Sequence, residues 1–213
     1  MLLTGKQIAR EIEKGRILLD PFDPRKLNPN SYNLTLADTL VVYEKQLGLH
    51  EAMELRLKKN GTIARPEMSQ LPFDLRVEEQ WTTLRIPEDG LVLFPGILYL
   101  ACTRECAGSD IFVPCIEGRS SLGRLGVFIH ATAGFGDLGF SGPGRPAQWT
   151  CEVTVTHPVR IYAGIDVCQV VFNTVWQEPD LGDLPRYTGK YTGQKGPKPS
   201  GFWKDFLKEK NNG

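Results

Sequence analysis

Short apolar runs separated by turn residues dominate the chain from Trp81 onward. The runs are "TTLRI", "LVLFPGILYLAC", "IFVPCIE", "LGVFIHATA", "WTCEVTVT", "VRIYAG" and "DVCQVVFNTV". Intervals of about 8 to 15 residues between such runs are typical of an all-β sandwich, barrel or jelly roll. Because no long helical period intervenes, a parallel α/β sheet is not expected.

The first residues carry the signals of one short helix. Thr4 and Gln7 have the spacing of a capping box, Ile8 and Ile12 recur at helical period, and Gly15 ends the pattern. Farther along, "YNLTLADTLVVYE" alternates like a β-strand.

Two further segments have weaker patterns. Residues 46–72 show mixed charge and little periodicity, which predicts loops and hairpins. Near the end of the chain, "FWKDFLKEK" is compatible with one or two helical turns.

Size, charge and cysteine content narrow the class of protein. With 213 residues and 41% hydrophobic content, the chain is expected to form a single domain over 1–213. Lys plus Arg and Asp plus Glu are both 25, so no net charge attracts nucleic acid or an acidic membrane, and neither is expected as a partner. Five cysteines without a C-x-x-C pair, no leader and no long apolar run predict a cytoplasmic protein.

Side chains that donate hydrogen bonds are concentrated in "EGRSSLGRLG", residues 117–126. Arg119 and Arg124 offer planar guanidinium groups suited to phosphate or carbonyl oxygens, and Ser120 and Ser121 add hydroxyls. The three glycines allow the backbone to approach a ligand closely. The stretch suits a phosphorylated small molecule, although a solvated turn with surface arginines has the same composition.

Two more stretches follow in order. In "HATAGFGDLGFSG", residues 130–142, four glycines surround Asp137, as they would in an ordinary loop. In "WTCEVTVT", strand alternation places Thr150 and Glu152 on one face and Cys151 and Val153 on the other. An outward-facing acid and an acid that lines a cleft would give the same pattern.

Together these stretches resemble the dCTP deaminase family and its trimeric dUTPase relatives. "GKYTGQKGP" is similar to the family's C-terminal segment that closes over phosphates, and "LTGKQIAREIEKGRI" and "LNPNSYNLTLAD" are similar to its first helix and strand. The resemblance runs from residue 3 to about residue 200, apart from the middle. It implies a mainly β fold, a distorted barrel or jelly roll with a short N-terminal helix, in which residues 186–213 form a flexible C-terminal lid.

One residue points to a subgroup. Enzymes that only deaminate dCTP usually have His after the Thr-Ala pair, whereas this chain has Gly134 in "TAGF". This is similar to the bifunctional dCTP deaminase:dUTPases, which convert dCTP to dUMP. The alternatives are a deaminase that stops at dUTP, a dUTPase alone, and a nucleotide-binding module without activity.

The resemblance also implies roles for individual residues. Glu152 would be the general base and proton shuttle, Ser120 and the carbonyl of Ala133 would orient the water, and Arg124 would stabilise charge. Asp137 would accept from the 3′-hydroxyl and help to place the water that attacks phosphorus, and Phe140 would leave no room for a 2′-hydroxyl. The residues at or beside phosphate-contacting positions are Arg119, Ser121, Gln169, Lys190, Tyr191 and Gln194.

Cofactor and assembly follow from the same resemblance. Neither the H-x-E nor the P-C-x-x-C half of the zinc deaminase signature is present, so no zinc and no dedicated protein metal site are expected. Mg²⁺ would be bound through the substrate triphosphate. The family implies a homotrimer that binds dCTP or dUTP at subunit interfaces.

The chain departs from the family's pattern at the extra "PGRPAQ", residues 143–148. This insertion would either alter the pocket or lengthen a surface hairpin.

Overall fold

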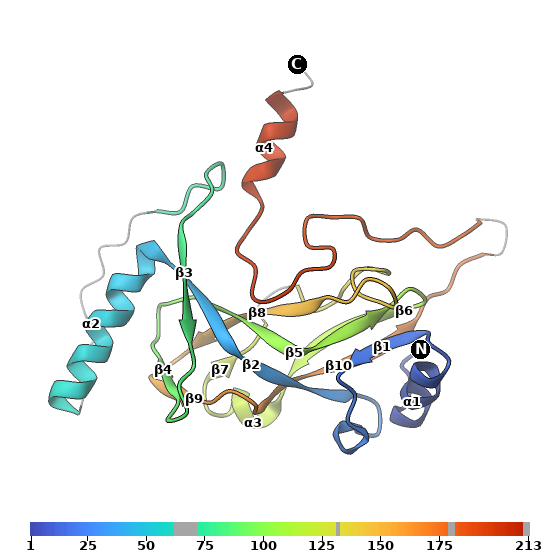
Figure 1. The fold of residues 1–213 in the computed structure, drawn as a ribbon, viewed down its shortest axis with the longest axis horizontal. Helices are drawn as coiled ribbons and strands as arrows, with labels where there is room; N and C mark the ends of the chain where they lie inside the picture. Colours follow the sequence, from blue (N-terminus) through green and yellow to red (C-terminus); the bar gives the residue numbers. More distant parts are fainter. Residues whose placement is uncertain (62–71, 131–132, 179–181, 211–213) are drawn as a thin grey trace.

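An antiparallel sheet of eight strands forms the body of the computed structural model, which describes residues 1–61, 72–130, 133–178 and 182–210. Its strands are β1 (Ile17–Asp20), β2 (Tyr32–Tyr43), β3 (Trp81–Arg85), β5 (Tyr99–Ser109), β6 (Phe112–Gly118), β7 (Val127–Phe128), β8 (Gln148–Val155) and β10 (Asp166–Thr174). They run in the order β6-β10-β2-β5-β8-β7, with β1 paired to β5 and β3 to β2. β4 (Leu91–Leu93) and β9 (Val159–Ile161) form a second, two-stranded sheet. The strands curl into a nearly closed barrel (Figure 1), which confirms the mainly β prediction.

The barrel core is built by the inward residues of these strands. In β8, burial alternates residue by residue, with Trp149, Cys151 and Val153 inside and Glu152 half-buried on the other face. The largest fully buried side chains include Tyr32, Tyr99, Phe94, Phe172 and Leu34. The alternation read from the sequence is therefore the alternation of the folded strand.

Four of the five cysteines are buried. They are Cys102, Cys106, Cys151 and Cys168, and all four are free. Burial raises the pKa of Cys102 to about 12, so its thiol stays protonated at neutral pH. These cysteines act as small apolar side chains.

The predicted first helix is α1 (Gly5–Glu13), and its start is capped as the sequence indicated. Thr4 Oγ1 accepts from the amide of Gln7 at 3.2 Å. The Gln7 side chain donates to Glu11 at 2.7 Å instead of reaching back to Thr4, so one half of the capping box is formed. Arg16 binds the fully buried Glu11 and lowers the pKa of that carboxyl.

The prediction of loops and hairpins over 46–72 is wrong for most of the described part. Residues Glu44–Asn60 form α2, while 62–71 lie outside the described residues. The inward positions are Gln46, Leu49, His50, Met53 and Leu57, and two of these five side chains are polar. Gln46 accepts from the amide of Leu98 at 3.2 Å, and His50 bonds to Tyr99 at 3.0 Å. Because specific hydrogen bonds let polar residues face the core, no apolar stripe marked the helix.

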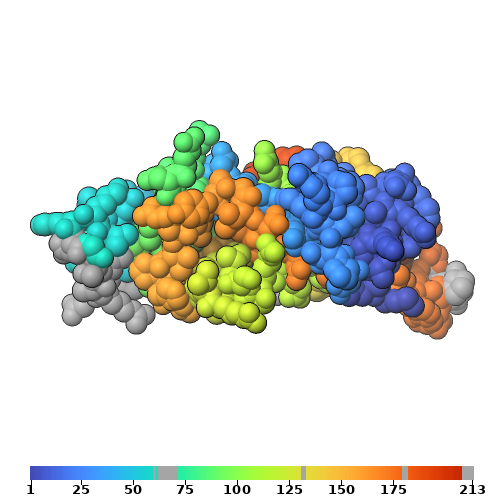
Figure 2. All heavy atoms as spheres, turned by 90° about the horizontal axis from the view of Figure 1, so that it is seen from below, coloured from blue at the N-terminus to red at the C-terminus, as the bar shows by residue number. Residues whose placement is uncertain are grey.

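The short elements lie at two sides of the barrel. A 3₁₀ helix, η1 (Pro24–Lys26), precedes β2, and α3 (Ser120–Gly123) follows β6. In Figure 1, α3 lies on the opposite side of β8 from α4 (Trp203–Lys210). Figure 2 shows the yellow-green atoms around α3 at the surface, between the blue N-terminal part and the orange segment that carries β9. In the described ranges, no helix has the length and apolar character needed to cross a membrane.

Candidate active site

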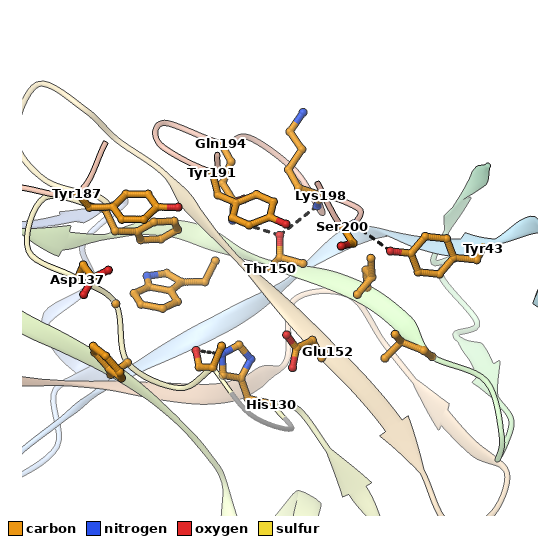
Figure 3. A pocket seen from close by; sticks show the side chains of 17 residues that line it. Tyr43, His130, Asp137, Thr150, Glu152, Tyr187, Tyr191, Gln194, Lys198 and Ser200 are labelled. Carbon is orange, nitrogen blue, oxygen red and sulfur yellow. Dashed lines mark hydrogen bonds between the residues drawn. The ribbon is translucent and has the colours of Figure 1, made fainter. Parts of the chain in front are cut away.

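A pocket of about 410 Å³ opens in front of β8. Thr150 and Glu152 line its floor because they occupy the half-buried face of that strand. Figure 3 shows Asp137 and Tyr187 at one end of the pocket, Tyr43 at the other, and the Glu152 carboxylate between them. The lining residues are Tyr43, Leu98, Leu100, His130, Ala133, Phe135, Gly136, Asp137, Phe140, Trp149, Thr150, Glu152, Tyr187, Tyr191, Gln194, Lys198 and Ser200.

Three aromatic rings form one wall of this pocket. The ring centroids of Phe140 and Trp149 lie 4.9 Å apart, and those of Phe140 and Tyr187 lie 5.9 Å apart in an edge-on arrangement. Trp149 is fixed because its Nε1 donates to the carbonyl of Ala107 at 2.9 Å. An aromatic wall of this kind suits the apolar face of a sugar or a base.

The loop after β7 forms a second wall. Its backbone is held on β6, since the amide of Ile116 donates to the Gly134 carbonyl at 2.5 Å and the amide of Gly136 donates to the Pro114 carbonyl at 2.8 Å. His130 Nε2 lies 2.7 Å from the Ala133 carbonyl oxygen. A Cβ at position 136 would lie 2.5 Å from the Trp149 ring, so this close approach requires glycine.

The C-terminal segment covers the pocket of the same chain. Gln194 Nε2 donates to the Gln148 carbonyl at 2.8 Å and to Thr150 Oγ1 at 3.2 Å, and the amide of Lys198 donates to the same Thr150 oxygen at 3.0 Å. Farther along, the amide of Ser200 donates to Tyr43 Oη at 2.9 Å. Burial raises the pKa of Tyr43, which keeps this hydroxyl protonated. Residues 194–200 are thus tied to β2 and β8.

Six residues predicted from the sequence meet in this pocket. They are Ala133, Asp137, Phe140, Glu152, Tyr191 and Gln194. The loop after β7, strand β8 and the C-terminal segment contribute them, so segments far apart in the sequence are brought together.

The other six lie outside the lining of this pocket. Ser120 and Ser121 are exposed on α3, and Arg124 follows it. Arg119 donates to the Asp166 carbonyl at 3.1 Å, and Gln169 accepts from Ser31 at 3.0 Å. Lys190 pairs with Asp205 and borders a neighbouring cleft of about 590 Å³. One chain does not bring the α3 residues to Glu152, and their roles stay predictions.

Several lining residues were not singled out as site residues from the sequence. Thr150 shares the Glu152 face of β8, so strand alternation was a signal for it. Tyr43, Tyr187 and Lys198 reach the pocket through tertiary contacts, for which the sequence carries no local signal. Among the described residues, no three His, Cys, Asp or Glu side chains are grouped to hold a metal ion. The expectation about zinc stays a prediction.

The comparisons with known proteins place this chain in a family. Residues 2–175 match the family model described as "dCTP deaminase-like", and the chain belongs to this family. A protein of Leptospira biflexa named "dCTP deaminase, dUMP-forming" is 41% identical over 210 residues, which cover 98% of this chain and 100% of that protein. Proteins of the same name from Clostridium beijerinckii and Cytophaga hutchinsonii are 40% and 41% identical, each covering 98% of this chain and 100% of its own length.

A solved structure supports the fold. The 2′-deoxycytidine 5′-triphosphate deaminase from Agrobacterium tumefaciens aligns with a TM-score of 0.53 at 16% identity. The alignment covers 82% of this chain and 48% of that chain. The dCTP deaminase-like fold inferred from the motifs is therefore confirmed.

Proposed function

We propose that this protein hydrolyses dCTP to dUMP, ammonia and pyrophosphate in the pocket in front of β8. The observation that carries the proposal is the Glu152 carboxylate, which faces the pocket in a chain about 40% identical to proteins named "dCTP deaminase, dUMP-forming". The reaction consumes two waters, one at the pyrimidine ring and one at phosphorus.

Deamination needs a water oxygen to attack C4, a proton to reach N3, and ammonia to leave. Glu152 takes a proton from the water and returns it to N3, and a second proton transfer releases the amine as ammonia. The Ala133 carbonyl accepts a hydrogen bond from the water, and Ser120 holds it from the other side. Arg124 stabilises the charge that develops on the ring. The contact of His130 with the Ala133 carbonyl, at 2.7 Å, supports a fixed position for that oxygen.

Hydrolysis at the α-phosphorus then converts dUTP to dUMP and pyrophosphate. Asp137 accepts from the 3′-hydroxyl and orients the attacking water, and Phe140 lies under the deoxyribose, where a 2′-hydroxyl would not fit. The triphosphate carries Mg²⁺ and contacts a set of donors from α3, β10 and the C-terminal segment. These donors are Arg119, Ser121, Gln169, Lys190, Tyr191 and Gln194.

The complete site is assembled in a homotrimer, with α3 of one subunit facing Glu152 of another. The position of Ser120 and Arg124 outside the pocket of their own chain supports this arrangement. Mixing Ser120→Ala chains with Glu152→Gln chains, after unfolding and refolding them together, tests it. We expect activity to return in the mixture although each variant alone is inactive. Inactive mixed trimers would contradict a shared site.

A product assay tests the reaction itself. The pure protein is incubated with dCTP and Mg²⁺, and the nucleotides are separated. Formation of dUMP is the expected result. Accumulation of dUTP would identify a deaminase alone, turnover of dUTP without turnover of dCTP a dUTPase alone, and binding without turnover a regulatory module.

The C-terminal segment acts as a lid that excludes water from the bound triphosphate. The hydrogen bonds of residues 194–200 to β2 and β8 support a closing position. Deleting residues 186–213 should abolish most turnover of dCTP. Undiminished activity of the truncated protein would contradict the lid.

A cytoplasmic location fits the same function. All five cysteines lie within the described ranges and are free, as expected in a reducing compartment. Fractionation of the native cells, with detection of this chain in the soluble or another fraction, tests the location.

A further inference from the structure

We propose that Asp110 is a positioning residue that joins the turn at 142–147 to the start of the C-terminal segment and thereby sets the aromatic wall of the pocket. Asp110 directly follows β5. Its Oδ1 accepts from Arg145 Nη2 at 2.7 Å, and its Oδ2 lies 3.6 Å from Arg186 Nη1. The kinetic part of this inference rests on the proposed function.

The turn at 142–147 presents Arg145 in a defined direction. The amide of Arg145 donates to the Gly142 carbonyl at 2.9 Å, with Pro143 and Gly144 at the centre of the turn, where these residue types are favoured. The buried Ser141 Oγ accepts from the amide of Ala147 at 3.0 Å and closes the base of the turn. These bonds order the turn, and Gln148, the last of the extra residues, already belongs to β8.

Gly139 allows the two arginines to converge. Its φ is +79°, and a Cβ there would lie 2.7 Å from Arg145 Nη2 and 3.1 Å from Arg186 Cβ. Both side chains therefore pack over this residue, and any side chain at 139 would separate them. The Asp110 carboxylate, only 19% exposed, lies between the two guanidinium groups and offsets one of their two positive charges.

Asp110, Arg145 and Arg186 together form what we call the Asp110 clamp. It acts on the pocket through Tyr187, the residue after Arg186. The amide of Tyr187 donates to the Leu138 carbonyl at 2.7 Å, and the Tyr187 ring meets the edge of Phe140. Tyr187 is the point at which the C-terminal segment joins the wall of Phe140 and Trp149. Fixing Arg186 thus fixes the position of the Tyr187 ring in the aromatic wall. Glu152 is held separately by the pairing of β8 with β5.

If the Asp110 clamp positions the wall, its loss should weaken substrate binding without a matching fall in the catalytic rate. Asp110→Asn should raise the KM for dCTP about three- to tenfold, because a partly exposed, charge-assisted contact is lost, while kcat stays within about twofold. Discrimination against CTP should fall, since Tyr187 packs against Phe140, the residue proposed to lie under the deoxyribose. Amide hydrogen exchange at Tyr187 should accelerate.

Three further variants make the test specific. Arg186→Ala, at a residue whose side chain is 58% exposed, should reproduce these changes even where Asp110→Asn destabilises the fold. Arg186→Lys should restore most of the dCTP affinity. Asp23→Asn, which removes a comparable 2.7 Å ion pair with Arg25 elsewhere, is the matched control and should change none of the readouts.

The outcomes separate this proposal from the proposed function. An unchanged KM together with unchanged exchange at Tyr187 in both Asp110→Asn and Arg186→Ala would overturn the clamp. Faster exchange with unaltered dCTP affinity would overturn its effect on the pocket. If the wild-type protein does not turn over dCTP, the proposed function fails, but calorimetric binding of dCTP and exchange at Tyr187 still decide whether Asp110 positions the wall.

Discussion

Glu105 and Glu152 lie on the paired strands β5 and β8 but have opposite surroundings. Glu105 is 2% exposed, and its carboxylate accepts from the Thr35 amide at 2.7 Å, from Thr35 Oγ1 at 2.6 Å and from Lys26 Nζ at 2.8 Å. Glu152 is half-buried, faces the pocket, and has no hydrogen-bond donor or ion-pair partner among the residues that the structure describes.

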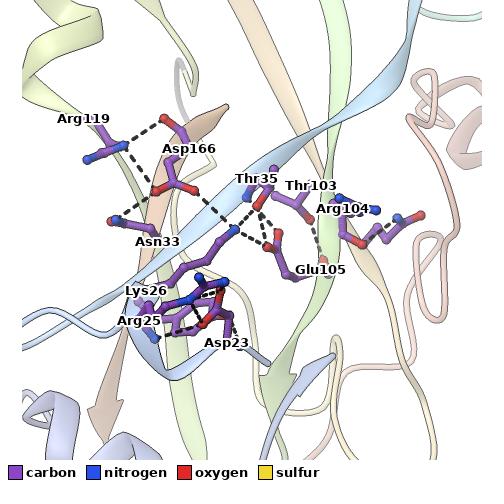
Figure 4. Close-up of polar contacts among 12 residues, drawn as sticks. Asp23, Arg25, Lys26, Asn33, Thr35, Thr103, Arg104, Glu105, Arg119 and Asp166 are labelled. Atoms are coloured by element: carbon purple, nitrogen blue, oxygen red, sulfur yellow. Dashed lines mark hydrogen bonds and ion pairs between the residues drawn. The ribbon is translucent and has the colours of Figure 1, made fainter. Parts of the chain in front are cut away.

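The network around Glu105 extends away from the barrel core. Figure 4 shows the Lys26 ammonium between Glu105 and Asp166, with Arg119 on the far side of Asp166. Lys26 Nζ lies 3.2 Å from Asp166 Oδ1, and Arg119 Nη1 lies 3.6 Å from Asp166 Oδ2. Every charge in this chain of contacts has an opposite charge beside it.

The difference shows that surroundings, not residue type, decide what an acid does. A carboxylate saturated by donors holds the fold together, because withdrawing it would leave buried donors unsatisfied. A carboxylate that keeps free lone pairs toward a pocket is available to a water and a substrate. Substitutions at these two acids and at their neighbours test this difference.

Removing Glu105 should have the largest effect. Glu105→Ala should lower the free energy of unfolding by about 3 kcal/mol, because it leaves the Thr35 donors without their acceptor and leaves Lys26 with Asp166 as its remaining acidic partner. Urea unfolding measures this loss. Glu117→Ala, at an exposed position of β6, is the control and should change stability by less than about 0.5 kcal/mol. Equal losses in the two variants would mean that the Glu105 network adds no stability.

Removing the charge of Glu152 should instead affect catalysis. Glu152→Gln keeps the size of the side chain and should lower the deamination rate about a hundredfold or more, with dCTP binding and the urea midpoint nearly unchanged. Ammonia release and calorimetric titration measure the two effects. Glu88→Gln, in an exposed turn, is the control. A near-normal rate would remove Glu152 from its role.

Asp137 provides a smaller, selective test of the pocket. Asp137→Asn should slow formation of dUMP by about tenfold or more while deamination continues, so that dUTP accumulates. Time courses of separated nucleotides measure this ratio. Unchanged dUMP output would mean that Asp137 is a loop residue without a part in hydrolysis.

His50 is expected to give the smallest effect, in stability and not in activity. Tyr99 Oη accepts from the amide of Phe94 at 3.0 Å, so its proton is free for His50 Nδ1, also at 3.0 Å. Burial lowers the pKa of His50 below 6.5, and the nearby Glu54 and Glu51 offset this only in part. The unfolded chain therefore binds more protons just below pH 6.5, and stability is lost as the pH falls from 6.5 toward the folded pKa.

Urea midpoints at several pH values measure this contribution. His50→Gln should lose less stability on acidification than the wild type. His157→Gln, at an exposed histidine, should behave as the wild type does. Identical pH profiles for the His50 variant and the wild type would contradict a buried, neutral His50.

Local sequence patterns predicted much of the fold. The period of two in residues 148–155 placed Glu152 opposite Cys151 and Val153, and the spacing of Thr4 and Gln7 placed the first helix. Motif order identified the dCTP deaminase-like family, which the comparisons confirm. Strand alternation and helix capping depend on neighbours within a few positions, and the order of motifs can be read along the chain, so the sequence contains all three directly.

Other features depended on contacts between distant segments. Helix α2 was missed because Gln46 and His50 are buried through bonds to β5 and the residue before it, a pairing that no local period reveals. The contacts of Arg145 and Arg186 with Asp110, and of Ser200 with Tyr43, join residues 35 to 157 positions apart.

The residues alone indicated the mainly β class and, through the order of the motifs, the family. They placed Glu152 on the polar face of its strand, and the family resemblance singled it out as a catalytic acid. Folding made two further distinctions. The Glu105 carboxylate is saturated with donors, whereas within the described ranges the Glu152 carboxylate has none, and the C-terminal segment is bonded to strand β8 of its own chain. The physical reason is that alternation and capping are short-range properties of the backbone. Hydrogen-bond saturation and pocket shape instead arise when strands from opposite ends of the chain meet.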